Sequence, residues 1–185
     1  MSGVTSSGDG LLDILNAVSE LSQIDVLVGV PHGEARTEGD GMTNAAIGYL
    51  QETGSPSQNI PARPFLVPGV EEVQEVIAEK LTYAVDAALT GNSKRMIFYL
   101  EAAGTKAMNS VRMYFVNGEF APLSLATIRA RANRGRVGAK KYLKQIKLGP
   151  PEDGLVKPLI DTQQLRKSVT YIIMKKDEEI KRADS

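Results

Sequence analysis

The sequence contains no cysteine among its 185 residues. This absence excludes disulfide bonds, thiolate zinc sites and cysteine nucleophiles, and it fits a reducing compartment. His32 is the only histidine, so a metal site built from several imidazoles is excluded as well. A pair of histidines acting as acid and base is excluded for the same reason.

Aromatic residues make up only 5% of the chain and tryptophan is absent, so the hydrophobic core must be mainly aliphatic. No apolar run approaches the roughly 18 residues that would span a membrane. The first twenty residues carry Asp9, Asp13 and Glu20 without any lysine or arginine, which is unlike a secretory leader. We therefore expect a soluble protein without a membrane partner, assembled in the cytoplasm and forming a single domain over residues 1–185.

Sequence motifs of the common enzyme classes are also absent. The chain has no phosphate-binding GxxxxGK[ST] loop, no GxGxxG after a strand, no GxSxG and no HExxH. Three acids at positions 34, 38 and 40 lie in a glycine-rich segment, but their spacing fits no known cation loop, so a solvated loop is the simpler interpretation. The sequence thus predicts no catalytic residues, no cofactor and no metal, and it disfavours an enzyme.

Charge is strongly segregated along a chain whose formal net charge is zero. Residues 1–90 contain three bases and thirteen acids, whereas residues 94–147 contain twelve bases and two acids. The simplest interpretation is that each block forms one solvated helix face. Two alternatives stay open: a basic surface that faces nucleic acid, or oppositely charged faces that meet between copies of the chain.

Hydrophobic periodicity predicts an α+β fold: a small, mainly antiparallel sheet that includes residues 24–30 and 168–174, packed by two long helices near 69–90 and 93–116. Shorter helices are expected after Asp9, after Thr43 or Asn44, and after Ser124. Residues 31–42 are rich in glycine and acids, and residues 133–157 lack sustained periodicity, so we expect both to form extended, flexible arms.

Three short stretches together resemble the bacteriophage neck and tail-completion family. They are NAAIGYLQETGSPSQNIPARPFLVPG (44–69), FAPLSLATIRAR (120–131) and KPLIDTQQLRKSV (157–169). The family typically shows an alanine-rich helix leading into I-P-A-R-P-F, then P-L-S-x-x-T, then K-P-L-x-D-T-G. The resemblance covers about residues 26–172, and the order of the three motifs makes it specific. The chain departs from the pattern at Thr53, where an aromatic residue is usual, and at Gln163, where a glycine is usual.

This resemblance implies a structural virion protein of the phage neck, assembled in the host cytoplasm, which joins or completes the head-to-tail interface. It implies a homo-oligomeric ring of six copies, or of a multiple matched to tail symmetry. The implied partners are other neck, portal-adaptor or tail proteins, and DNA passes through the lumen without specific binding. The alternative is a DNA-binding accessory protein that uses the basic block 94–147 without sequence preference.

The stretch around residues 59–69 is stiff before anything binds it. Pro61 and Pro64 fix their own φ angles and push the residue before each of them toward extended geometry. Phe65 can then anchor the segment on the core while Arg63 points at a carboxylate or at backbone carbonyls. Arg63 either pairs within its own chain, for example with Glu52, or contacts a neighbouring subunit.

The remaining candidate interface residues are basic. We expect them to contact protein partners rather than DNA, because strong phosphate contacts from bases in the lumen would slow the passage of DNA. They are Arg129, Arg131, Arg134, Arg136, Lys140, Lys141 and Lys144.

Overall fold

The computed structural model describes residues 9–33, 41–152, 154–161, 163–176 and 178–183. Helices and a small antiparallel sheet make the chain an α+β protein, as the sequence predicts. The chain forms two compact units: unit 1 comprises Met1–Gly29, Val70–Ser110 and Thr170–Ser185, and unit 2 comprises Val30–Gly69 and Val111–Val169. That the two units act as the single domain expected over 1–185 stays a prediction.

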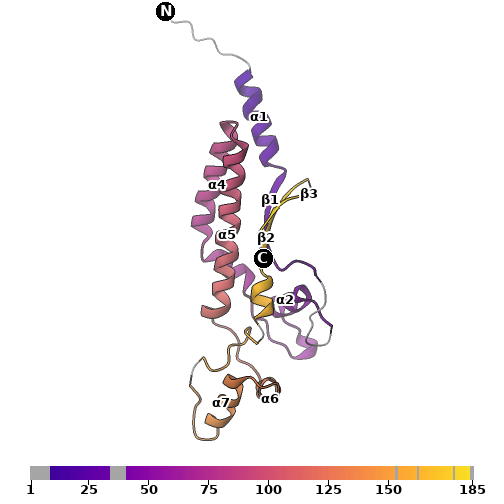
Figure 1. Cartoon of the computed structure of the whole chain (residues 1–185), viewed down its shortest axis with the longest axis vertical. Helices are drawn as coiled ribbons and strands as arrows, with labels where there is room; N and C mark the ends of the chain where they lie inside the picture. Colours follow the sequence, from indigo (N-terminus) through magenta and orange to yellow (C-terminus); the bar gives the residue numbers. More distant parts are fainter. Residues whose placement is uncertain (1–8, 34–40, 153, 162, 177, 184–185) are drawn as a thin grey trace, which may run out of the picture. The chain divides into compact units, whose positions relative to one another are not determined.

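The sheet of unit 1 has the order β1-β2-β3, with β2 in the centre. β1 (Ile24–Gly29) pairs antiparallel with β2 (Thr170–Lys175), so that the two strands expected from the sequence are neighbours. β3 (Glu178–Arg182) lies at the edge of the sheet (Figure 1), and all of its residues are exposed. Its sequence EEIKR lacks the apolar alternation of a half-buried strand, and for this reason the sequence does not predict it.

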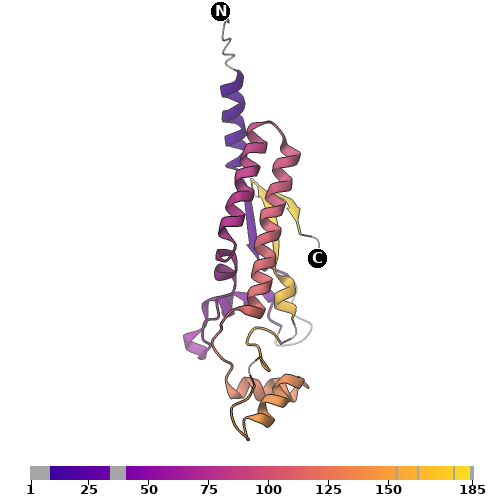
Figure 2. The ribbon, with the colours of Figure 1, turned by 90° about the vertical axis from the view of Figure 1, so that its left-hand side faces the viewer.

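In unit 1, α4 (Gln74–Leu89) lies beside the first part of α5 (Ser93–Asn117) (Figure 2). The first part of α5, up to Ser110, belongs to unit 1. Gly104 of α5 faces the ring of Tyr171 on β2, and a Cβ atom placed there would lie 2.6 Å from that ring. The close contact between helix and sheet therefore requires a residue without a side chain at this position.

The helix expected near 69–90 is interrupted. It consists of α3 (Leu66–Glu71) and α4, and the apolar face predicted for it is only partly buried. Leu81 and Val85 are 39% and 41% exposed. Two alanines of the predicted face, Ala84 and Ala88, are buried, and so is Ala87 beside them, because small residues let the helix approach its neighbours closely.

Unit 2 begins with α2 (Asn44–Thr53), which starts and ends as the sequence predicts. The backbone N–H of Ala46 donates to the Thr43 hydroxyl at 3.1 Å, and Gly54 ends the helix at a φ of 74°. A 3₁₀ turn, η1 (Pro56–Gln58), follows. The core of this unit contains the rings of Phe65 and Phe115, whose centroids lie 4.4 Å apart.

The expectation of a flexible arm over 133–157 is wrong for its first part. α6 (Leu125–Asn133), capped by Ser124, is followed by α7 (Val137–Gln145). Ala139 of α7 is buried against Ile128 and Ala132 of α6. α7 is too short for its apolar residues to produce a sustained periodic signal, and lysines separate them in the sequence. Most of the other expected arm, residues 34–40 within 31–42, lies outside the described residues.

The last helix of unit 2, α8 (Gln164–Ser168), follows a residue in the left-handed region. Gln163 has a φ of 62° and a ψ of 1°, the kind of conformation that the glycine usual in the resembling family would adopt freely. The departure at Gln163 therefore leaves this backbone turn in place, with a side chain where glycine would be less strained.

Replacing Gln163 with glycine is expected to raise the free energy of unfolding by about 0.5–1 kcal/mol, because the strain of a left-handed residue with a Cβ is relieved. Urea denaturation followed by circular dichroism measures this change. Asn59 is a matched control, since it also has a positive φ of 55° and asparagine tolerates that region well. Asn59→Gly should change stability by less than Gln163→Gly does. A loss of stability in Gln163→Gly would contradict this expectation.

Candidate functional site

The three stretches that carry the resemblance meet in unit 2, and a buried arginine joins the first to the second. Arg63 is 6% exposed. Its Nε donates to the carbonyl of Ala121 at 2.7 Å and its Nη2 donates to the carbonyl of Pro122 at 3.0 Å. Its Nη1 donates to Gln51 Oε1 at 3.3 Å, and burial lowers the pKa of the guanidinium. Arg63 thus pairs within its own chain, with a cluster of backbone carbonyls.

Glu52, suggested by the sequence as a partner of Arg63, has another role. Its Oε2 accepts hydrogen bonds from the backbone N–H groups of Phe65 at 2.7 Å and Leu66 at 2.9 Å, and its Oε1 accepts one from Val67 at 3.2 Å. These N–H groups lie at the start of α3, where no intrahelical acceptor exists. The carboxylate therefore caps α3 and holds the proline-rich stretch against α2.

A second buried arginine joins the second stretch to the third. Arg131 is 8% exposed. Its Nη1 donates to the carbonyls of Lys157 at 2.8 Å and Ile160 at 3.2 Å, and its Nη2 donates to the carbonyl of Pro158 at 2.7 Å. Burial lowers the pKa of Arg131, and the carboxylate of Asp161 opposes that shift. Two arginines thus connect all three motifs through backbone carbonyls.

The carboxylate of Asp161, in the third stretch, pairs with the neighbouring arginines. Its Oδ2 accepts a hydrogen bond from Arg134 Nη2 and its Oδ1 accepts one from Arg136 Nε, both at 2.8 Å. Arg131 Nε lies 4.0 Å from the same carboxylate. Three of the seven basic candidates are therefore engaged inside unit 2, and that they also contact another molecule stays a prediction.

A groove of about 870 Å³ opens over this network in unit 2. Four of its lining residues are prolines, which give it a stiff wall: Pro56, Pro61, Pro122 and Pro158. Arg63 and Arg131 also line it, and Pro61 is exposed at its wall whereas Phe65 is buried in the core. Pro64 is exposed beside them. Each of the three motifs contributes to the groove, which we call the motif groove.

The other four basic candidates point outward: Arg129, Lys140, Lys141 and Lys144 are exposed. Within the described part of the chain they have no ion pair or hydrogen bond from their side chains. On α7 the lysines lie opposite Ala139, which is buried, and between Glu119 and Glu152 the chain has no acidic residue. α6 and α7 together therefore present a positive surface, which we call the α7 basic face.

Three further cations stabilise unit 2, and two of them, Lys157 and Arg166, belong to the third stretch. Arg112 Nη2 donates to the carbonyl of Val169 at 2.8 Å, and Arg166 Nε donates to the carbonyl of Arg112 at 2.9 Å. Lys157 Nζ donates to the carbonyl of Val116 at 2.6 Å. The sequence does not predict these contacts, because each spans more than forty residues and ends on a backbone carbonyl.

The described residues hold no group of three or more histidines, aspartates or glutamates that could bind a metal ion. His32 is exposed, and Glu34, Glu38 and Asp40 lie outside the described residues. No helix in the described part of the chain is long and apolar enough to cross a membrane.

Neither family models, curated proteins nor solved structures match this chain. Its function is therefore inferred from the three motifs and from the geometry that unit 2 gives them.

Proposed function

We propose that this protein is a structural subunit of the head-to-tail joint of a tailed bacteriophage, where copies of it form a ring. The observation that carries the proposal is the convergence of the three motifs. Residues 44–69, 120–131 and 157–169 are separated by long stretches of chain, yet Arg63 and Arg131 tie them into one network of hydrogen bonds. Side chains that bind backbone carbonyls in this way stabilise the fold, and this is the role that the signature motifs of a structural protein family would have.

The motif groove and the α7 basic face offer the surfaces that a subunit of a joint needs. The groove has a stiff proline wall, so a partner that enters it meets a surface that loses little conformational entropy on binding. The basic face can meet an acidic surface of another copy or of a neck, portal-adaptor or tail protein. Both surfaces belong to unit 2.

A second candidate function is sequence-independent DNA binding by the α7 basic face. These four side chains, Arg129, Lys140, Lys141 and Lys144, are exposed and have no partner among the described residues, which favours it. If these four bases each neutralise a phosphate, the logarithm of the binding constant should fall with the logarithm of salt concentration with a slope of about −3.6.

The experiment that tests the proposal uses a charge-reversed variant, Lys140→Glu/Lys141→Glu/Lys144→Glu. We expect phage particles made with this variant to accumulate unjoined heads and tails, as seen by electron microscopy. Lys94→Glu, which changes an exposed lysine of unit 1, is the control and should leave joining intact. Joined, infective particles from the triple variant would contradict a role of this face in the joint.

Native mass spectrometry of the purified protein at low and high salt provides the second readout. A closed oligomer that dissociates as salt rises is expected, because exposed charges are screened over about 8 Å at physiological ionic strength. A steep salt slope for binding to random DNA, with normal joining by the triple variant, would instead favour the DNA-binding alternative.

A further inference from the structure

The motif groove is bordered by two guanidiniums that are almost fully buried, those of Arg63 and Arg131. A guanidinium has five N–H donors, and hydrogen bonds within the chain use three of them in each side chain. One N–H on Nη1 and one on Nη2 of Arg63, and one on Nη2 of Arg131, are left without an acceptor among the described residues. A ligand in the groove can supply these acceptors.

The described lining of the motif groove contains no aspartate or glutamate. Arg63 has no carboxylate partner in the described part of the chain, and Glu52 is bound to the N–H groups that begin α3. Asp161, which lies near Arg131, is shared with two further arginines. A buried charge without a counter-charge is costly, so the two guanidiniums would stabilise an anion that entered the groove.

The pKa of Arg131 reflects this shortage of negative charge. Burial lowers the pKa most, and the carboxylate of Asp161 raises it. The positive charges of Arg134, Arg63 and Arg136 lower it further, so the two guanidiniums that border the groove are close enough to repel each other. An anion placed against both side chains would relieve this repulsion.

The first turn of α6 adds two polar side chains to the same lining, Ser124 and Thr127. The Ser124 hydroxyl oxygen accepts a hydrogen bond from the backbone N–H of Thr127 at 3.2 Å, and the two hydroxyl oxygens lie 2.9 Å apart. Only one of the two hydroxyl hydrogens is needed for the contact between them, so the other can donate to a ligand. The partial positive charge at the start of a helix also favours an anion here.

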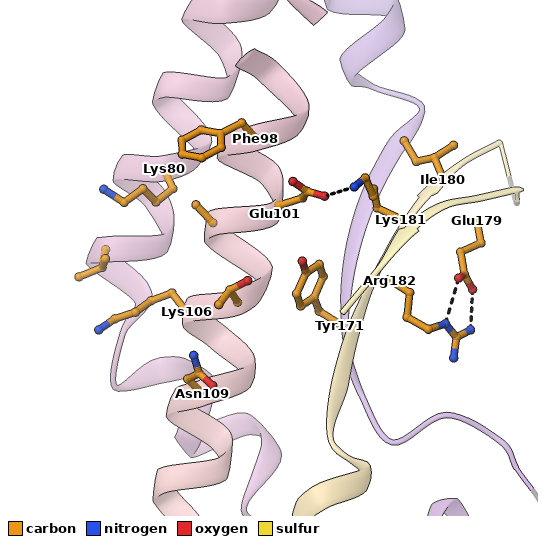
Figure 3. A pocket seen from close by; sticks show the side chains of 13 residues that line it. Lys80, Phe98, Glu101, Lys106, Asn109, Tyr171, Glu179, Ile180, Lys181 and Arg182 are labelled. Carbon is orange, nitrogen blue, oxygen red and sulfur yellow. Dashed lines mark hydrogen bonds and ion pairs between the residues drawn. The ribbon is translucent and has the colours of Figure 1, made fainter. Parts of the chain in front are cut away.

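In the described part of unit 1, the surfaces that could take a ligand lack this combination. Helix α1 (Asp9–Leu21) exposes an apolar side but contains no base. A groove of about 800 Å³, lined by α4, α5 and β3, contains acids and bases in the same lining. Figure 3 shows Glu101 paired with Lys181, and Glu179 paired with Arg182. Those acids neutralise bases within their own groove, whereas the described lining of the motif groove has no acid that could do so.

The rest of the lining of the motif groove indicates which anion fits. Beside the four prolines it contains the aliphatic side chains of Ile60 and Leu123. Arg63 and Arg131 are the only bases of the described lining, and both are recessed. The successive phosphates of a nucleic acid would therefore meet prolines and aliphatic groups rather than cations. A single planar carboxylate on an apolar peptide matches both the guanidiniums and the apolar wall.

We propose that the motif groove binds a short acidic peptide segment of a partner protein, with one carboxylate held against Arg63 and Arg131. The apolar neighbours of that carboxylate pack on the proline wall. The groove volume of about 870 Å³ lies within the range of ligand pockets, and clusters of arginine recognise acidic motifs in other proteins. The inference goes beyond the proposed function and does not rest on it, because it assigns a ligand to the groove in any assembly.

An NMR titration tests the inference on the full-length protein at physiological salt. The probe is a short peptide with blocked ends and one glutamate between apolar residues, and the matched peptide carries glutamine instead. We expect the glutamate peptide to shift the Nε–Hε signals of Arg63 and Arg131. It should bind at least about ten-fold more tightly than the glutamine peptide, because a charged acceptor makes the stronger hydrogen bond. Equal binding of the two peptides, or unchanged signals of these arginines, would overturn the inference.

A carboxylate built into the groove should compete with the peptide. Thr127→Glu places an acid four residues before Arg131, on the same side of α6, so the glutamate peptide should bind at least about ten-fold more weakly. Thr127→Gln has the same length without the charge and should change binding less than about two-fold. Both residues are favoured at the third position after a serine cap, so folding should persist, and circular dichroism verifies it.

Ala126→Glu is the matched control for added charge, since Ala126 is exposed on the same helix but does not line the groove. Charge at an exposed site is screened, so this variant should weaken peptide binding less than about three-fold. Equal weakening by Ala126→Glu and Thr127→Glu would contradict a carboxylate site inside the groove.

Three further results would refute the assignment. Tighter binding of inorganic phosphate than of the glutamate peptide would make the groove a phosphate site. Loss of peptide binding in the α7 triple variant would place the peptide on the α7 basic face. A wild-type oligomer that Thr127→Glu dissociates would mean that an acid of a second copy, and not of a separate partner, fills the groove. Peptide binding in the groove together with normal joining by the α7 triple variant would support this inference and count against the proposed role of the basic face.

Discussion

Replacing Arg63 with alanine is expected to lower the free energy of unfolding by about 3 kcal/mol. The guanidinium is buried and its donors reach the carbonyls of Ala121 and Pro122. Without them, these carbonyls lose charge-assisted hydrogen bonds, each worth about 1.5–3 kcal/mol, and remain partly desolvated. The truncation also removes the link between the proline-rich stretch and the segment that precedes α6. Urea denaturation followed by circular dichroism measures the loss.

Two variants control this experiment. Arg63→Lys keeps the positive charge but not the planar fork, so it should recover less than half of the lost stability. Gln51→Ala removes the longest of the three contacts, at 3.3 Å, and should cost less than about 1 kcal/mol. If Arg63→Ala had the same urea denaturation midpoint as the wild type, water would have replaced the guanidinium at the two carbonyls. That result would contradict the role of Arg63 as an internal clamp.

The second large effect distinguishes two arginines of α6 that lie two positions apart. Arg131→Ala is expected to cost about 3 kcal/mol, because three carbonyls of residues 157–160 lose their donor and Asp161 loses one of its cations. Arg129→Ala should change stability by less than about 0.5 kcal/mol, because Arg129 is exposed. The same urea experiment measures both.

In a binding assay, in contrast to the stability measurement, we expect a clear effect of Arg129→Ala. Arg129→Ala removes part of the α7 basic face, so partner or DNA binding should weaken while the fold persists. Equal destabilisation by both substitutions would contradict the division of the basic residues into internal and external sets. Wild-type stability of Arg131→Ala would do so as well.

Several parts of this protein follow from local sequence alone. The strands expected near 24–30 and 168–174, the cap at Thr43, the cap at Ser124 and the end of α2 at Gly54 are all confirmed. These features depend on strand propensity, on side chains that bind nearby N–H groups and on glycine at a positive φ. Each of these causes acts within a few residues, so the sequence carries the signal directly.

Other parts could not be predicted because a partner segment outside the element stabilises them. β3 forms since β2 supplies a neighbouring edge, although its own residues carry no apolar alternation. α7 is helical because Ala139 packs on Ile128 and Ala132, and its own periodicity is too short to indicate this. In both cases the partner segment, and not the local pattern, stabilises the element.

The sequence by itself determined the residue types available for function and the order of the three motifs. It excluded thiol chemistry and multi-histidine sites, and it placed a stiff proline-rich stretch before a helix. Only the tertiary structure decided which bases are internal clamps and which face outward, because the partners of Arg63 and Arg131 are backbone carbonyls 26 to 59 residues away. A carbonyl is present at every residue, so no residue type in the sequence marks it as the acceptor of an arginine.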